Sequence, residues 1–459
     1  MSKPHKLPSS YEINTINSSS LVTLTSNEVN QSGGKRREKN APREGKFTTS
    51  DTGTVLHIIK SNLGSGLLAM PFAFHNIGLL MGSVSTVLVG VVCAHCMHIL
   101  VKSSQELCYQ EDRVSLTYSE TVEAAFRLGA GGRVKKYSRV MKIVADVFMF
   151  IAYYGVNLVY VILVADTAKQ VVENHTDFVM NIRLYALLLT VILLPIGIVR
   201  HMKLLVPFSA MANVFLLIGC SLTLYLCIRD LPPLSSRPLV VAVTRWPLFF
   251  STAIFGMEGI GTTMPIENAM HYPAHFLGCP GTLTVGMTVV AFAYFFVGSI
   301  GYIRFGDEVQ GLVTLNLPQD ILSESVKVFV ALSILFTYPL QLSATVDVFW
   351  PMLRHRFSEE HQDRGYYLVR GTLILGTVLI AISLPHLAPV LSLVGALGFN
   401  GVGLMLPTVT ELATYWDHLK KPFGLTIIKA TAILIVWAFA TVSGTISSIN
   451  EIINAFLIT

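Results

Sequence analysis

The chain has 459 residues, of which 52% are hydrophobic and only 13% are charged, whereas about a quarter of the residues of an ordinary soluble protein are charged. This composition excludes a soluble globular fold and predicts an all-α polytopic membrane protein. The formal net charge of +5 comes mostly from the N-terminal tail and from loops, so it indicates membrane orientation and excludes nucleic acid as a partner.

The first fifty residues are polar, rich in Ser and Asn, and carry a basic cluster at 35–39. A segment of this composition cannot bury enough apolar surface to fold. We therefore predict a disordered cytoplasmic tail over residues 1–50, followed by one transmembrane domain over residues 51–459.

Apolar runs of roughly twenty residues, the length that crosses a bilayer as a helix, follow the tail. Charged residues, Pro or Gly bound each run. They predict about eleven transmembrane helices, at 54–78, 80–101, 140–166, 182–199, 204–228, 246–268, 282–303, 325–350, 368–385, 389–410 and 425–449.

Lys and Arg gather in alternate connections, most densely in the loop between the second and third helices. Because basic loops stay on the cytoplasmic side, we predict a cytoplasmic N-terminus. The odd number of helices then places the C-terminus on the extracellular or lumenal side. The sequon at Asn174 agrees with this orientation, since it is expected in the outer loop after the third helix. Asn174 is therefore a candidate glycosylation site.

The first apolar span holds residues that a plain membrane anchor avoids. Over 57–71 the sequence HIIKSNLGSGLLAMP sets a His, a Lys and an Asn beside two glycines and a Pro. A broken helix persists at membrane depth only where its freed backbone groups are buried in protein or line a cavity. We therefore predict that this helix unwinds at a transport site.

The sixth span repeats these features, with FGMEGIGTTMP over 255–265. Taken alone, either segment is explained more simply by close helix packing at Gly and a kink at Pro. Two interrupted spans five helices apart instead favour a site between two inverted five-helix repeats. We place these repeats at about 54–228 and 246–410, with the eleventh helix at 425–449 outside them.

Backbone geometry at the two breaks predicts the class of substrate. Where the first helix unwinds, the amides of Gly64, Ser65 and Gly66 lose their carbonyl partners at the dipole-positive end of the next half-helix, which favours a carboxylate. Where the sixth helix unwinds, carbonyls near Phe255 and Gly256 end the preceding half-helix at its negative end, which suits an ammonium group. The two breaks together select a zwitterion with closely spaced charges, an amino acid.

Four polar residues accompany the breaks. Asn62 and Glu258 are further candidate substrate ligands, and the Glu258 carboxylate either carries a proton or holds the unwound segment through hydrogen bonds to its amides. His57 titrates near physiological pH and is a candidate for proton coupling, while a neutral His hydrogen-bonded to a neighbouring helix is the alternative. Lys60 is a candidate fixed cation where other transporters bind sodium.

Several separated motifs occur in a characteristic order: the segment 57–71, Ala94-His95-Cys96-Met97, Phe255-Gly256-Met257-Glu258-Gly259 with Pro265-Ile266-Glu267-Asn268-Ala269-Met270, and Leu315-Asn316-Leu317-Pro318. With these motifs the chain, from about residue 50 to its end, resembles the proton-assisted amino acid transporters of the amino acid/auxin permease superfamily. The resemblance implies a leucine-transporter-type fold with eleven helices and symport of a proton with a small neutral amino acid such as glycine, alanine or proline. It also implies a plasma or endolysosomal membrane location and a part in proton coupling for His57 and His95.

Two other functions stay open on the sequence. Some members of the family that the chain resembles act mainly as sensors, so one alternative is an amino acid transceptor with little flux that recruits growth-signalling partners through its tail. A sodium-coupled carrier is the other. An enzyme is not expected, because we find no nucleophile motif, phosphate-binding loop or metal-ligand spacing. We predict no metal and no cofactor, with a proton as the coupling ion.

Overall fold

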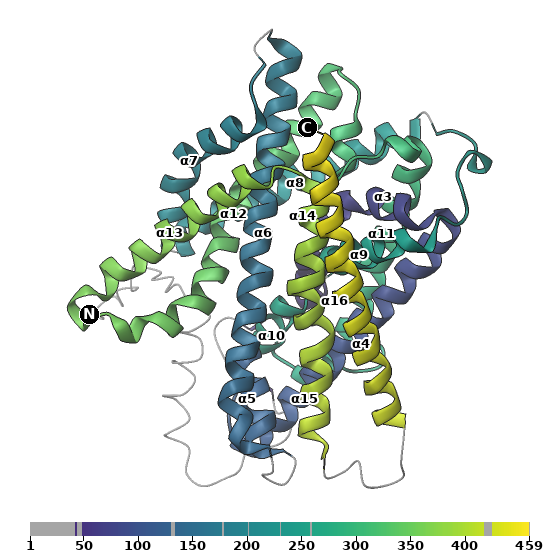
Figure 1. Cartoon of the computed structure of the whole chain (residues 1–459). Helices are drawn as coiled ribbons and strands as arrows, with labels where there is room; N and C mark the ends of the chain where they lie inside the picture. Colours follow the sequence, from purple (N-terminus) through teal and green to yellow (C-terminus); the bar gives the residue numbers. More distant parts are fainter. Residues whose placement is uncertain are drawn as a thin grey trace, which may run out of the picture.

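The computed structural model describes residues 42–43, 48–129, 134–176, 179–200, 202–229, 231–257, 259–416 and 425–458. Helices occupy most of this part of the chain (Figure 1), and the α-helices are α2 (Asp51–Asn62), α3 (Ser65–Ile77), α4 (Leu79–Glu111), α5 (Tyr118–Leu128), α6 (Ser138–His175), α7 (Ile182–Ile198), α8 (Met202–Arg229), α9 (Trp246–Met257), α10 (Ile260–Asn268), α11 (Thr282–Phe305), α12 (Ile321–Leu353), α13 (Gln362–Ser383), α14 (Leu387–Val394), α15 (Leu406–Thr414) and α16 (Leu425–Ile458).

Two π-helical segments, η11 (Gly395–Phe399) and η12 (Gly401–Met405), join α14 to α15. Single 3₁₀ turns lie in the connections, at Lys135–Tyr137, Leu234–Ser236, Val243–Arg245, Pro273–His275, Gly306–Glu308, Val313–Asn316, Arg354–Arg356 and Glu359–His361. In the described residues, β-structure is limited to an isolated parallel bridge between Thr49 and Met270.

Eight helical stretches of the described chain are long and apolar enough to cross a membrane, namely α4, α6, α8, α11, α12, α13, the stretch from α14 to α15, and α16. The other three predicted spans correspond to α7, which has 17 residues, and to the pairs α2/α3 and α9/α10, each half of which is shorter than a bilayer. The chain is thus a multi-pass membrane protein, and the count of eleven spans stays a prediction.

The loop predicted between the second and third spans is partly helical. α4 continues to Glu111, and α5 follows as a separate amphipathic helix. A capping box starts α5: the Thr117 hydroxyl accepts a hydrogen bond from the Glu120 amide, and the Glu120 carboxylate accepts one from the Thr117 amide at 2.9 Å. Burial raises the pKa of Glu120, but the Thr117 hydrogen bonds and the Arg113 charge outweigh burial and hold that pKa below its ordinary value.

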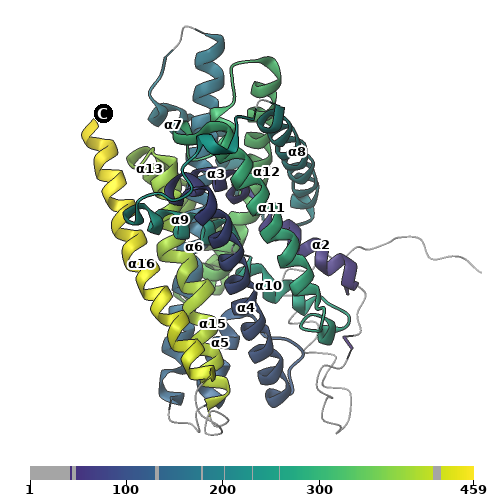
Figure 2. The ribbon, with the colours of Figure 1, turned by 90° about the vertical axis from the view of Figure 1, so that its right-hand side faces the viewer.

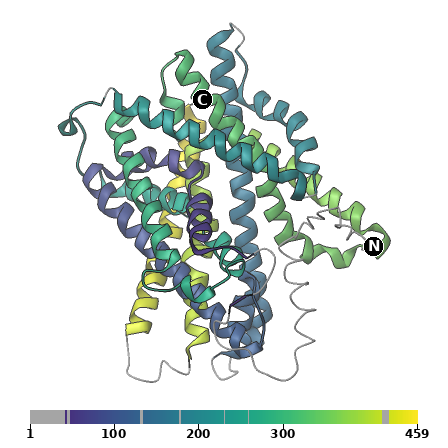
Figure 3. The ribbon, with the colours of Figure 1, turned by 180° about the vertical axis from the view of Figure 1, so that it is seen from behind.

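The long helix α6 runs beside the column formed by α14, α15 and α16 (Figure 1). After a quarter turn of the view, α16 lies along one edge of the molecule, with α2 and α8 toward the opposite edge (Figure 2). From behind, α2 lies near the centre of the view with α3 to its left (Figure 3); α11 packs against both of them, and α9 packs against α3. The two predicted broken helices are therefore neighbours in the core of the fold.

A fully buried arginine ties three of the long helices together. Arg370 on α13 donates through Nε to the carbonyl of Gly197 in the last turn of α7, a carbonyl without an intrahelical partner. Its Nη2 donates to Ser343 Oγ on α12 at 2.8 Å, and its Nη1 donates to Tyr366 Oη on its own helix at 3.0 Å. The forked guanidinium suits this role because it supplies donors in several directions from one group.

Candidate functional site

Both predicted breaks are present. α2 ends at Asn62 and α3 begins at Ser65, so only Leu63 and Gly64 separate them. α9 ends at Met257 and α10 begins at Ile260. Glu258, the ionisable residue predicted at the second break, lies outside the described residues. Each helix therefore splits into two halves whose terminal backbone groups have no partner in the next half-helix.

The two breaks touch each other through glycine. A Cβ placed on Gly66 would lie 2.4 Å from the Cα of Gly256, well inside any real contact between carbon atoms. A Cβ on Gly259 would likewise lie 2.3 Å from Nδ2 of Asn62. Gly66 and Gly256 are thus required here for close approach of one backbone to the other, and Gly259 leaves room for the Asn62 side chain, which brings the predicted residues Asn62, Gly66 and Gly256 into one site.

Tyr294 on α11 has its hydroxyl between the two breaks, within hydrogen-bond distance of one carbonyl in each. Its hydroxyl lies 2.7 Å from the carbonyl oxygen of Asn62 and 2.5 Å from that of Gly256, and its side chain is fully buried. Both carbonyls belong to the last turn of a half-helix, where backbone acceptors lack intrahelical donors and the helix dipole is negative. The sequence analysis missed this residue, because a single Tyr in an apolar helix carries no signal that separates a site from packing.

The site presents donors and acceptors on facing sides. α3 has no side-chain cap, and in the described part of the chain the amides of Gly64, Ser65 and Gly66 donate no hydrogen bond within the protein. Asn62 donates through Nδ2 to the carbonyl of Ile58 at 2.9 Å, while its buried Oδ1 has no hydrogen-bond partner among the described residues. Free amides at a helix N-terminus bind anions, and the Asn62 oxygen suits a cationic donor.

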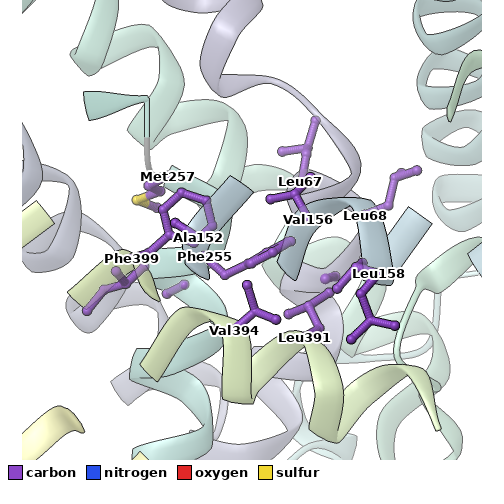
Figure 4. Packing of buried hydrophobic residues seen from close by; sticks show 14 of the residues in the cluster. Leu67, Leu68, Ala152, Val156, Leu158, Phe255, Met257, Leu391, Val394 and Phe399 are labelled. Atoms are coloured by element: carbon purple, nitrogen blue, oxygen red, sulfur yellow. The ribbon is translucent and has the colours of Figure 1, made fainter. Parts of the chain in front are cut away.

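An apolar wall closes the site on the side of α9. Phe255 is buried and meets Phe399 edge to face, with 5.6 Å between ring centroids. Figure 4 shows Phe255 surrounded by apolar side chains from several helices, among them Val156 of α6 and Val394 of α14. Tyr153 of α6 also reaches the second break, since a Cβ on Gly261 would meet its hydroxyl. Apolar lining of this kind matches a ligand with an uncharged side chain.

The predicted coupling residues lie apart from this apolar wall. His57 and Lys60 are both exposed on α2, although their neighbour Ile58 packs against Gly286 of α11. The described residues offer no hydrogen-bond or ion-pair partner to His57, so the alternative of a His fixed by a neighbouring helix finds no support in this conformation. His95 is half-buried on α4, and its buried Nε2 has no hydrogen-bond partner in the described chain.

Beside His95 lies an ion pair that the sequence analysis did not anticipate. Glu411 of α15 and Lys429 of α16 are near enough to act on the His95 ring electrostatically. They pair with each other, with Lys429 Nζ at 2.9 Å from one carboxylate oxygen of Glu411 and 2.8 Å from the other. The Glu411 side chain is almost completely buried. The ion pair thus joins α15 to α16, and α15 also packs against α4, the helix that carries His95.

A second unanticipated cluster fixes the segment before α2. Arg43 contacts both carboxylate oxygens of the buried Glu267 at 3.2 Å, and Gln105 Nε2 donates to the same carboxylate at 2.9 Å. The amide of Arg43 also donates to the carbonyl of His271 at 2.9 Å. Residues 42–43 and 48–50, which were predicted as part of a disordered tail, are thus held against the end of α10, while the rest of that prediction lies outside the described residues.

The predicted position of the sequon needs correction. Asn174 was expected in a loop, whereas it lies in the last turn of α6, and its Nδ2 donates to Glu324 Oε1 at 3.2 Å. The apolar run predicted for this helix ended at 166, but the helix continues to His175, and Lys169 and Glu173 form an ion pair four residues apart in this extension, at 4.0 Å. Glycosylation of Asn174 stays a prediction, and it would require this amide to leave Glu324.

Comparisons with known proteins agree with this architecture. Residues 48–453 match the family model described as transmembrane amino acid transporter protein. The chain is 34% identical over 417 residues to the proton-coupled amino acid transporter-like protein pathetic of Drosophila melanogaster, which covers 91% of this chain and 88% of that protein. It is 24% identical over 455 residues to the probable amino acid transporter skat-1 of Caenorhabditis elegans, covering 95% of this chain and 97% of that protein.

Among solved structures, the chain is similar to the inward facing conformation of Mhp1, with a TM-score of 0.50 and 13% sequence identity over 91% of this chain and 93% of that chain. A likeness at this identity concerns the fold alone. It confirms the predicted leucine-transporter-type architecture, in which two discontinuous helices meet near the middle of the membrane.

Proposed function

The chain belongs to the transmembrane amino acid transporter family, and from this premise we propose that it is a secondary active symporter that moves a small neutral amino acid together with a proton. The observation that carries the proposal is the contact of two unwound helices at Gly66 and Gly256, with free amides on one side and backbone acceptors on the other. The name of the Drosophila relative, a proton-coupled amino acid transporter-like protein, supports the coupling ion.

In this proposal the amides of Gly64, Ser65 and Gly66 hold the carboxylate of the amino acid at the N-terminus of α3. Anions are favoured there by the unpaired N–H groups and by the helix dipole. The ammonium group lies against the Asn62 Oδ1 and the Gly256 carbonyl, both acceptors near the C-terminal end of a half-helix. The α-carbon then lies between the breaks, and its side chain faces the apolar wall around Phe255.

Size selection follows from the tight approach of the two breaks. Because Gly66 and Gly256 are already in contact, an amino acid enters only if the halves move apart, and each added side-chain atom requires more movement in a close-packed core. Glycine, alanine and proline need the least. A charged side chain would also lose its hydration against Phe255 and its apolar neighbours without a counterion in the wall.

The proposed proton acceptor is His57, with His95 as a second titratable group. His57 is exposed on α2, so its imidazole is not enclosed by the protein, and histidine is the side chain whose ordinary pKa lies nearest physiological pH. Lys60, exposed one turn further along α2, would supply a fixed positive charge in place of a metal cation. Glu258 would stabilise the second break.

The test is uptake of labelled alanine into proteoliposomes that contain the purified protein. We expect uptake to rise as the external pH falls from about 7.5 to 5.5, and to stay the same when sodium is replaced by choline. An uncoupler that dissipates the proton gradient should stop accumulation above equilibrium. Uptake that is indifferent to external pH would refute proton coupling, and uptake that ceases in choline would favour the sodium-coupled alternative.

A further inference from the structure

The Tyr294 hydroxyl lies at the point where two half-helices end. The carbonyl of Asn62 is the last of α2, and the carbonyl of Gly256 is in the last turn of α9. Both lie within hydrogen-bond distance of the same phenolic oxygen, at 2.7 and 2.5 Å. A third acceptor, Asn62 Oδ1, is buried without a hydrogen-bond partner in the described chain, and it belongs to a residue that already contacts the hydroxyl through its backbone.

This point strongly attracts positive charge. Each half-helix contributes about half a negative elementary charge at its C-terminus; Asn62 and Tyr294 are buried there and Gly256 is partly buried. In transporters built from broken helices, unwound carbonyls and half-helix C-termini are the groups that coordinate a coupling cation. Here a side-chain hydroxyl meets those carbonyls instead, and its hydrogen offers them a partial positive charge.

Packing fixes the hydroxyl at this point. The Tyr294 side chain is fully buried, and a Cβ on Gly256 would meet its Cε1 at 2.7 Å and its hydroxyl oxygen at 3.3 Å. The ring therefore lies directly on the backbone of the second break. Since Gly66 is also in contact with Gly256, the ring and both breaks form one packed unit, and a change in the ring is transmitted to both unwound segments.

We propose that Tyr294 is a positioning residue whose hydroxyl occupies the place of a coupling metal cation between the two breaks. The inference rests on the proposed transport function and deepens it, because it assigns a physical reason for transport without sodium. A phenol carries one hydrogen and donates to one carbonyl at a time. The other carbonyl is left as an acceptor for the ammonium group of the amino acid, whereas a metal cation would engage both at once.

The decisive variant is Tyr294→Phe, which keeps the ring and removes the hydroxyl. The carbonyls of Asn62 and Gly256 then lose their donor among the described residues, and we expect sodium to enter the space that the hydroxyl leaves. Alanine affinity measured in choline should weaken about tenfold, since a buried acceptor left unsatisfied is destabilising by that order. Sodium should restore much of this loss, and it should raise the midpoint of thermal unfolding of the purified variant in detergent.

The matched control is Tyr302→Phe. Tyr302 is on the same helix and is also fully buried, but its hydroxyl has no hydrogen-bond partner among the described residues. Its removal should change neither alanine affinity nor the response to sodium. Thermal unfolding in sodium chloride and in choline chloride at equal ionic strength is compared for the wild type and both variants. If Tyr294→Phe does not give folded protein, Tyr294→Met removes the same hydroxyl, and its alanine affinity and thermal unfolding are measured in the same two salts.

The outcomes separate this inference from the proposed function. The inference is supported if sodium raises the unfolding midpoint of Tyr294→Phe but not that of the wild type or of Tyr302→Phe. This result would support it even if alanine uptake proved not to be driven by protons, which would refute the proposed function. A Tyr294→Phe protein that binds alanine as the wild type does, or that shows no response to sodium in either assay, overturns the inference while leaving proton symport standing. Wild-type uptake driven by sodium overturns both.

Discussion

Gly64 and Gly66 belong to the same motif, yet the structure predicts opposite responses to an added methyl group. In Gly66→Ala the new Cβ would lie 2.4 Å from Gly256 Cα, which is roughly 1 Å or more below an ordinary carbon contact. The atom it meets is backbone, so relief requires the two breaks to separate. Overpacking of this kind is destabilising by about 1–3 kcal/mol. In Gly64→Ala the Cβ would meet nothing within 4 Å, and the backbone at Gly64 is extended.

The assay is thermal unfolding of both purified variants in detergent, followed by alanine uptake into proteoliposomes. We expect Gly66→Ala to unfold several degrees below the wild type and to lose most of its uptake. Gly64→Ala should keep the stability of the wild type. It should nevertheless raise the KM for alanine, because its methyl group enters the space from which the substrate carboxylate approaches the amides. Equal unfolding midpoints for the two variants would refute the contact between the breaks, and an unchanged KM in Gly64→Ala would refute the place of the carboxylate.

Three further predictions concern the charged groups. Glu267→Gln leaves Arg43 buried without its counterion and should lower the free energy of unfolding by about 3–5 kcal/mol. In a double-mutant cycle with Arg43→Ala, the two losses should be clearly less than additive. Strict additivity would mean that the pair does not interact. Arg370→Lys keeps a charge but cannot reach Gly197, Ser343 and Tyr366 from one nitrogen, so we expect a loss of about 1–3 kcal/mol in thermal unfolding, and wild-type stability would contradict this account. His57→Gln should abolish the rise in alanine uptake between about pH 7.5 and 5.5, and His95→Gln is measured in parallel. An intact rise in His57→Gln would show that His57 is not the proton acceptor.

Local sequence was sufficient to predict the broken helices. A Gly-x-Gly motif with an ionisable residue nearby and a Pro a few residues later is expensive in a plain membrane helix, so its presence indicates a break whatever the rest of the fold does. The same argument identified both breaks, at Leu63 and Gly64 and near Gly259. The predicted spans also correspond to helices throughout, because hydrophobic length alone determines which segments cross a bilayer.

Helix ends were predicted less well. α4 and α6 continue well past the apolar runs at 80–101 and 140–166, since a helix that leaves the bilayer need not end where its hydrophobicity ends. The helix α5 was absent from the prediction, although its Thr117 and Glu120 form the recognised capping-box pattern. Asn174 was assigned to a loop for the same reason and lies within α6.

What the sequence alone determined is therefore that the chain is a multi-pass helical membrane protein, and where two of its helices break. Only the tertiary structure decided that Gly66 rests on Gly256, that the Tyr294 hydroxyl lies between the carbonyls of Asn62 and Gly256, and that Arg43 pairs with Glu267. The physical reason is that a broken helix is a local property of backbone and side-chain chemistry. The partners of its freed groups come from segments up to 232 residues away, and their meeting depends on how the helices pack.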